Sequence, residues 1–92
     1  MPARELYGRY RQRIEALAAR PPQPSDAWFP EMQQILRSFT EDARVLSPSR
    51  THLLCWELCE QFEEEAYRAA TLYRRDVLIA AVKGFEGIAG DR

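Results

Sequence analysis

Residues 48–83 read PSRTHLLCWELCEQFEEEAYRAATLYRRDVLIAAVK, with no glycine and no proline after the first position. Apolar or small side chains recur along this segment at Cys55, Cys59, Phe62, Ala66, Ala69, Tyr73, Val77 and Ala80. Their spacing of three and four residues places them on one face of an α-helix. Ser47 followed by Pro48 is a typical helix start, because serine caps free N–H groups and proline is tolerated at the first helical position. We therefore predict helix from Pro48 up to Gly84.

The length of this segment calls for either a break or a second chain. One straight helix would be about 55 Å long at 1.5 Å per residue, about twice the length of either helix predicted upstream. A break near Arg74–Asp76 would give helices 48–74 and 76–86, since cations favour a helix C-terminus and Asp76 is a good N-cap. Alternatively, the helix stays straight and a second copy of the chain covers it, which makes a homodimer. The run 77–82 is apolar on all sides and needs cover in both cases. We favour the break.

Two more helices are predicted upstream, over residues 3–20 and 26–46. Both show the same spacing, with apolar residues at Leu6, Tyr10, Ile14 and Leu17 in the first and at Met32, Phe39, Ala43 and Leu46 in the second. The prolines at 21–24 end the first helix. Ser25 or Asp26 is the expected N-cap of the second.

These patterns predict an all-α fold. We expect a small antiparallel helical bundle of three long helical segments, which becomes a four-helix bundle if the last segment is broken. The 92 residues are enough for one hydrophobic core, so 1–92 is taken as a single domain. The glycine-bearing tail, residues 87–92, is expected to be flexible.

Composition and charge restrict the environment and the classes of partner. The chain is 46% hydrophobic and 29% charged, with a net charge of −1, so no global field attracts nucleic acid or an anionic membrane. No stretch approaches the ~20 apolar residues of a membrane span. The first residues are charged rather than typical of a secretory signal. Two cysteines are too few for a disulfide-rich secreted module. We expect a cytoplasmic protein with reduced thiols and no membrane association.

A weak candidate metal site consists of His52, Cys55, Cys59 and Glu63. Steps of three, four and four residues bring these side chains within an arc of about 80° on one helix, and their donor atoms suit zinc or copper. Cys55 and Cys59 also lie on the apolar face, where a free cysteine acts as a small hydrophobic residue. We therefore favour core packing, and predict no metal and no cofactor.

The charges are segregated by helix. Residues 3–20 hold five arginines and two glutamates, a net charge of +3, whereas residues 47–70 hold two arginines and five glutamates, a net charge of −3. These two surfaces can pair inside the molecule or with a partner. The candidate partner-binding residues are Arg4, Arg9, Arg11, Arg13, Glu57, Glu60 and Glu64. The arginines among them, interleaved with Tyr7 and Tyr10, also suit phosphate contacts in nucleic acid.

The sequence offers little for catalysis. It has a single histidine, no Gly-x-Ser-x-Gly motif and no phosphate-binding glycine loop, so we expect no enzyme. The expected function is protein–protein interaction, as an adaptor, an inhibitor or a small subunit. The alternative is a nucleic-acid-associated regulator or the small subunit of a ribonucleoprotein, acting through the first helix. Any exposed aromatic residue among Trp28, Phe29, Trp56, Tyr67 and Tyr73 would mark the binding face.

Overall fold

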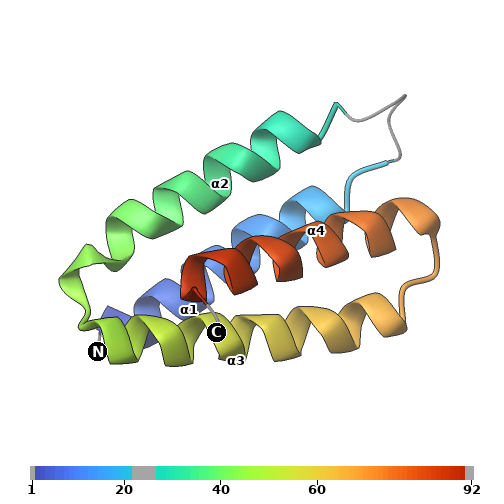
Figure 1. Cartoon of the computed structure of the whole chain (residues 1–92). Coiled ribbons are helices and arrows are strands. Elements are labelled where there is room, and N and C mark those ends of the chain that lie inside the picture. The colour runs from blue at the N-terminus through green and yellow to red at the C-terminus, as the bar shows by residue number, and fades with distance from the viewer. Residues whose placement is uncertain (1, 22–26, 91–92) are drawn as a thin grey trace.

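The computed structural model describes residues 2–21 and 27–90 of the chain. Within these ranges lie four α-helices, namely α1 (Pro2–Ala18), α2 (Phe29–Asp42), α3 (Pro48–Tyr67) and α4 (Leu72–Ala89), with a 3-10 turn, η1 (Ala43–Val45), after α2. Successive helices run in opposite directions (Figure 1). The predicted all-α helical bundle is confirmed, in its four-helix form.

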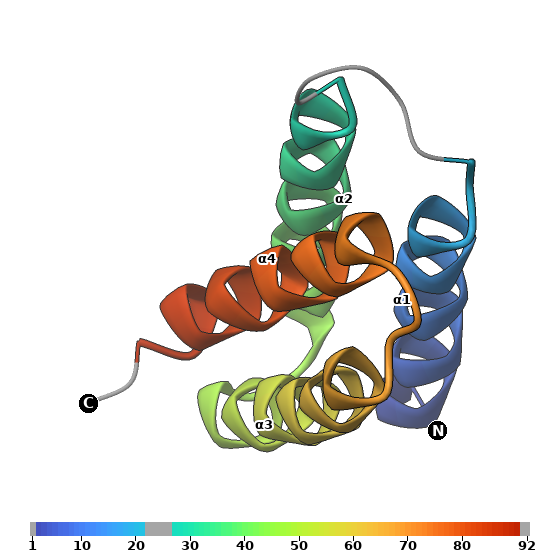
Figure 2. The ribbon, with the colours of Figure 1, turned by 90° about the vertical axis from the view of Figure 1, so that its right-hand side faces the viewer.

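The helices are arranged so that α2 and α3 lie on opposite sides of the bundle (Figure 2). α1 and α4 lie between them and contact each other as well as both outer helices. Val77, Leu78, Ala81 and Val82 are buried within one copy of the chain. Most of the apolar run 77–82 is thus buried inside the monomer, whereas Ile79 is 36% exposed.

The break after α3 lies earlier than predicted. α3 ends at Tyr67, and the N-cap of α4 is Thr71, whose Oγ1 accepts a hydrogen bond from the backbone N–H of Arg74 at 3.2 Å. Arg74 and Asp76 both lie inside α4, so the predicted boundary at Arg74–Asp76 is wrong. A hydroxyl cap satisfies an N–H group that would otherwise lack a partner, and this outweighs the preference of charged side chains for helix ends.

Other predicted boundaries also differ from those observed. α4 continues past residue 86 to Ala89 and ends at Gly90, whose φ of 77° is the left-handed conformation that glycine adopts without strain. α2 begins at Phe29, three residues after the predicted start, and its regular part ends at Asp42. The caps predicted at Ser25 or Asp26 lie outside the described residues.

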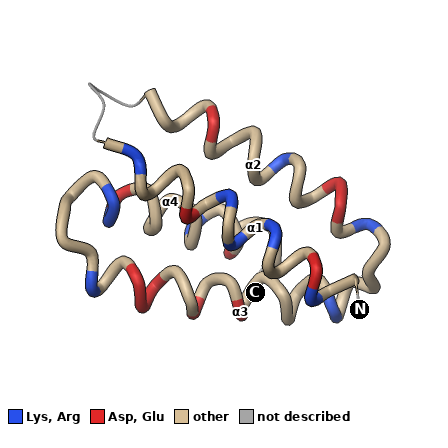
Figure 3. The backbone as a smooth tube through the Cα atoms, turned by 180° about the vertical axis from the view of Figure 1, so that it is seen from behind, with Lys and Arg blue, Asp and Glu red and all other residues tan. Residues whose placement is uncertain are grey.

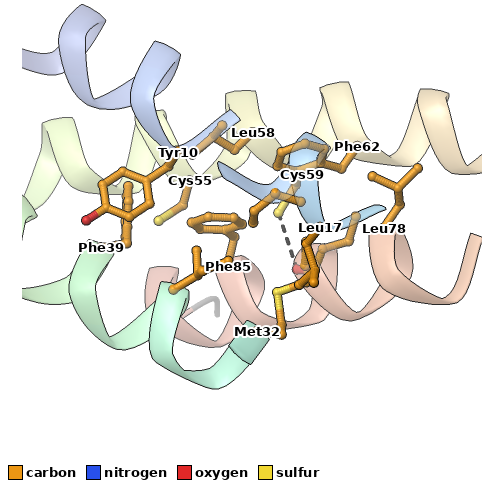
Figure 4. Packing of buried hydrophobic residues seen from close by; sticks show 14 of the residues in the cluster. Tyr10, Leu17, Met32, Phe39, Cys55, Leu58, Cys59, Phe62, Leu78 and Phe85 are labelled. Carbon is orange, nitrogen blue, oxygen red and sulfur yellow. Dashed lines mark hydrogen bonds between the residues drawn. The ribbon is translucent and has the colours of Figure 1, made fainter. Parts of the chain in front are cut away.

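The core contains a row of aromatic rings, one from each helix (Figure 4). Tyr10 packs edge-on against Phe39, with ring centroids 5.2 Å apart, and Phe39 packs edge-on against Phe85 at 4.9 Å. Phe85 in turn stacks on Phe62 at 6.2 Å. All four side chains are fully buried. Phe85 of α4 therefore joins the outer helices α2 and α3 through the centre of the bundle.

α2 packs tightly against α4 at Gly84, where the side chain of Leu36 lies over the glycine. A Cβ added at Gly84 would lie 2.3 Å from Cδ1 of Leu36, so the packing leaves no space for a side chain there. A Cβ added at Gly87, one turn later, would meet nothing within 4 Å. In the described part of the chain, no helix is long and apolar enough to cross a membrane.

Candidate partner-binding surface

The charged faces of α1 and α3 meet along the line where these two helices lie side by side, running in the same direction (Figure 1). Nη1 of Arg4 lies 3.9 Å from Oε1 of Glu57, and Nη2 of Arg11 lies 3.3 Å from Oε2 of Glu65. Of the two pairings that the segregated charges allow, the one inside the molecule is therefore present.

The other two candidate arginines of α1 also have neighbours. Nη1 of Arg9 lies 3.3 Å from Oδ2 of Asp42, which also accepts a hydrogen bond from the hydroxyl of Tyr10 at 2.5 Å. The guanidinium of Arg13 lies over the Tyr10 ring, 5.2 Å from its centroid. Basic positions are spread over all four helices, as Figure 3 shows. Each candidate arginine of α1 thus has a carboxylate or an aromatic ring beside it.

Glu65 is held more firmly than the other carboxylates of α3. It accepts hydrogen bonds from Gln61 at 2.5 Å and from Arg11 and Arg74 at 3.3 Å each. Partial burial acts to raise the pKa of Glu65, but hydrogen bonds with Gln61, Glu15 and Arg11, together with the positive charge of Arg11, outweigh it and lower the pKa. Arg74 also pairs with Glu15 of α1 at 2.8 Å. This network ties α1, α3 and α4 together, so we assign Glu65 a structural role.

The three candidate carboxylates, Glu57, Glu60 and Glu64, lie on the solvent side of α3. At about 100° per residue, five side chains fall within an arc of about 80°. We call them the α3 stripe: Leu53, Glu57, Glu60, Glu64 and Tyr67. All five are exposed. The structure thus brings Glu57, Glu60 and Glu64 together on one face, with an apolar or aromatic side chain at each end.

The carboxylates of the α3 stripe are only weakly neutralised. Glu57 has Arg4 at 3.9 Å, and Glu64 has Arg68, the C-cap residue of α3, at 3.3 Å. Both pairs are more than half exposed, where an ion pair adds little stability. Across the described residues, Glu60 has no basic group within 4.0 Å. The face is therefore negative and open to a positive partner.

A shallow groove runs beside the stripe, between α3 and α1. Its first part is mainly apolar, has a volume of about 270 Å³, and is lined by Ala3, Arg4, Arg50, Leu53, Leu54 and Glu57. Its second part is polar, has a volume of about 300 Å³, and is lined by Arg4, Tyr7, Glu57, Glu60, Gln61 and Glu64. Both parts are lined by Arg4 and Glu57, so they adjoin at the contact between these two side chains.

Exposed apolar and aromatic side chains also occur on α3, although Val45 of η1 and Leu72 of α4 are exposed as well, at 74% and 69%. Leu53 is 64% exposed and Tyr67 is 92% exposed. Trp56, next to the stripe, is 37% exposed and donates its Nε1–H to Nε2 of His52 at 2.9 Å. Of the other aromatic residues considered from sequence, Phe29 is exposed at the start of α2, far along the chain from α3. Tyr67, the most exposed of these aromatic side chains, thus lies on α3.

The weak candidate metal set is not brought together. Cys55 and Cys59 are buried in the core, and the Sγ of Cys59 donates to the carbonyl of Val82 at 3.5 Å (Figure 4). Burial raises the pKa of the Cys55 thiol to about 11 and that of Cys59 to about 12. Metal binding needs thiolates, which these pKa values suppress at neutral pH. His52 and Glu63 are exposed instead, and no cluster of three or more potential ligands occurs in the described ranges.

A second groove lies on the far side of the bundle, between α2 and α4. It has a volume of about 520 Å³ and includes Gly84 and Gly87 in its lining. Its charged residues are Arg37, Glu41 and Arg44, so both signs are mixed along it. The mixed charge gives this groove less preference for one kind of partner than the groove beside α3.

Leu53 is the member of the α3 stripe that sequence reasoning missed. Its neighbour Leu54 continues the apolar face, so Leu53 reads as an unremarkable member of a hydrophobic pair. The helical spacing identifies it, because Leu53 projects from the same face of α3 as the glutamates at 57, 60 and 64 and not from the face of Cys55.

The chain matches no known protein family, no curated protein and no solved structure.

Proposed function

We propose that this protein is a protein–protein interaction module, acting in the cytoplasm as an adaptor, an inhibitor or a small subunit. It binds a partner protein through the α3 stripe and the adjoining groove between α1 and α3. The proposal involves no catalytic step and no cofactor. Its output is occupancy of the partner's surface.

The observation that carries this proposal is the position of Leu53. The side chain is 64% exposed at the apolar end of the groove, on the same face of α3 as three carboxylates. Burying a leucine side chain fully contributes about 1.5–3 kcal/mol. Carboxylates around such an apolar contact add orientation and a faster encounter with a partner of opposite charge. An apolar anchor beside a charged strip is how many interaction surfaces are built.

Site-specific photo-cross-linking in the source cells tests the proposal. A photoreactive phenylalanine analogue replaces Leu53 in one variant and Gln33, which is exposed on α2, in a matched control. We expect position 53 to yield a discrete adduct with another protein and position 33 to yield none. Adducts of equal abundance at both positions, or none at position 53, would contradict the proposal.

Nucleic-acid binding through α1 is the competing proposal. It requires Arg4, Arg9 and Arg11 to give up their contacts with carboxylates of the protein and to bind phosphate groups of the nucleic acid instead. Such binding would weaken steeply as salt is added and would be lost when these arginines are changed to alanine. Electrophoretic mobility shifts with RNA and DNA at low salt decide the question, because a protein-binding module gives no shift.

A further inference from the structure

Resting on the proposed function, we infer that the partner presents a basic amphipathic helix to the groove between α1 and α3. An apolar residue of that helix enters the apolar end of the groove at Leu53. Lysine or arginine residues seven and eleven positions away contact Glu60 and Glu64. The inference adds the chemistry of the partner and the spacing of its contacts.

The spacing follows from the positions of the α3 stripe residues along the helix. Glu60 and Glu64 lie seven and eleven residues after Leu53, or about 10.5 and 16.5 Å along the helix axis at 1.5 Å per residue. A second helix lying alongside also returns to the same face after seven and eleven residues. An extended strand would cover these distances in about three and five residues at 3.3 Å each, and a side chain at an odd step would point away. A partner helix in the groove can therefore contact Leu53, Glu60 and Glu64 at the same time.

The charges set the register of the partner helix. Arg4 and Arg50 flank the apolar end of the groove, so a cation placed beside Leu53 would be repelled. The polar end is lined by Glu57, Glu60 and Glu64 and by a single arginine, Arg4, while Arg68 lies beside Glu64. The same groove therefore selects an apolar residue at one end and basic residues at the other.

The contact between Arg4 and Glu57 crosses the groove and must yield when the partner binds. It is long, at 3.9 Å, and its two side chains are 69% and 55% exposed, so its loss costs little. Arg4 keeps a second contact after release, because its guanidinium lies 5.5 Å from the centroid of the Tyr7 ring. The groove can therefore open without a rearrangement of the helices.

Synthetic peptides test the inference with the full chain. The probe is an 18-residue helical peptide with one leucine and with lysines seven and eleven positions after it. Three control peptides carry glutamate in place of both lysines, alanine in place of the leucine, or lysines three and five positions after the leucine. Binding is followed by fluorescence anisotropy of the labelled peptide. We expect a Kd on the order of 100 μM or tighter for the probe and at least about tenfold weaker binding for each control.

The protein variant E60Q/E64Q should weaken binding of the probe about tenfold, whereas E41Q, which removes an exposed carboxylate from α2, should leave it unchanged. Equal binding of the lysine and glutamate peptides would overturn the inference, as would preference for the three-and-five spacing or equal effects of the two protein variants. Absence of peptide binding together with a cross-linked partner at position 53 would refute the basic helix alone. Absence of both would refute the proposed function as well.

Discussion

The two glycines of α4 at 84 and 87 should respond in opposite ways to substitution by alanine. Alanine gains about 1 kcal/mol over glycine in the interior of a helix. At Gly87 nothing opposes this gain, because a Cβ there would meet no atom within 4 Å. We expect Gly87→Ala to stabilise the protein by about 0.5–1 kcal/mol.

At Gly84 the same gain is opposed by a steric clash. The added methyl would lie 2.3 Å from Cδ1 and 2.9 Å from Cδ2 of Leu36, whereas carbon atoms in ordinary contact are about 3.5–4.0 Å apart. The leucine must therefore move by about 1 Å or more, and overpacking of this kind costs about 1–3 kcal/mol. The free energies of unfolding of Gly84→Ala and Gly87→Ala should consequently differ by about 1–3 kcal/mol.

Urea denaturation followed by circular dichroism measures both variants. In a chain of this size, 1 kcal/mol also shifts Tm by roughly 4–8 °C, so thermal melts give a second reading. The double variant Leu36→Ala/Gly84→Ala removes the clash, and we expect alanine at 84 to be tolerated in that background. If both alanines stabilise the wild-type chain equally, the close approach of α2 to α4 is refuted.

Three further predictions concern the helix cap, the buried thiols and the aromatic row. Thr71→Ala should lower the free energy of unfolding by about 1 kcal/mol, while Asp76→Ala should change it by less than about 0.5 kcal/mol. Equal effects of the two variants in urea denaturation would contradict the assignment of Thr71 as the N-cap of α4. Because burial raises the pKa of Cys55 to about 11 and of Cys59 to about 12 from an ordinary 9.0, the folded state binds more protons than the unfolded state above pH 9. The contribution of the thiols to stability should therefore be complete below pH 9 and fall as pH rises, towards 11 for Cys55 and towards 12 for Cys59, by up to about 1.4 kcal/mol per pH unit for each thiol. Denaturation at pH 8 and pH 10 should show a smaller loss for Cys55→Ala/Cys59→Ala than for wild type, and an equal loss would contradict the thiol assignment. Tyr10→Phe removes the hydrogen bond to a carboxylate and should cost about 1.5–3 kcal/mol, measured by the same denaturation; no loss would mean that water replaces this bond.

The helical core was predictable because it depends on spacing alone. Leu6, Tyr10, Ile14 and Leu17 share one helical face by arithmetic, and all four are buried. The end of α3 was harder to predict. Thr71 competes as an N-cap with Asp76 five residues later, and both residue types are good caps. Which one is used depends on where α4 must begin in order to pack, and this is a property of the whole bundle.

The candidate surface was predictable only in part, for a similar reason. The opposite charges of residues 3–20 and 47–70 indicate that the two helices attract each other. The pairing of Arg11 with Glu65, rather than with Glu60 or Glu64, depends on the register of α1 against α3. Register is set by how the buried side chains interlock, so the sequence does not reveal which carboxylates stay open to a partner.

The aromatic row has a consequence for synthesis on the ribosome. Phe85, which lies in the last helix, is the ring that connects Phe39 to Phe62. A nascent chain that stops before α4 would expose both of those rings to water and would lack the helix that touches all three others. Closure of the core must therefore wait until α4 has been translated, and products that terminate early would keep these apolar rings exposed.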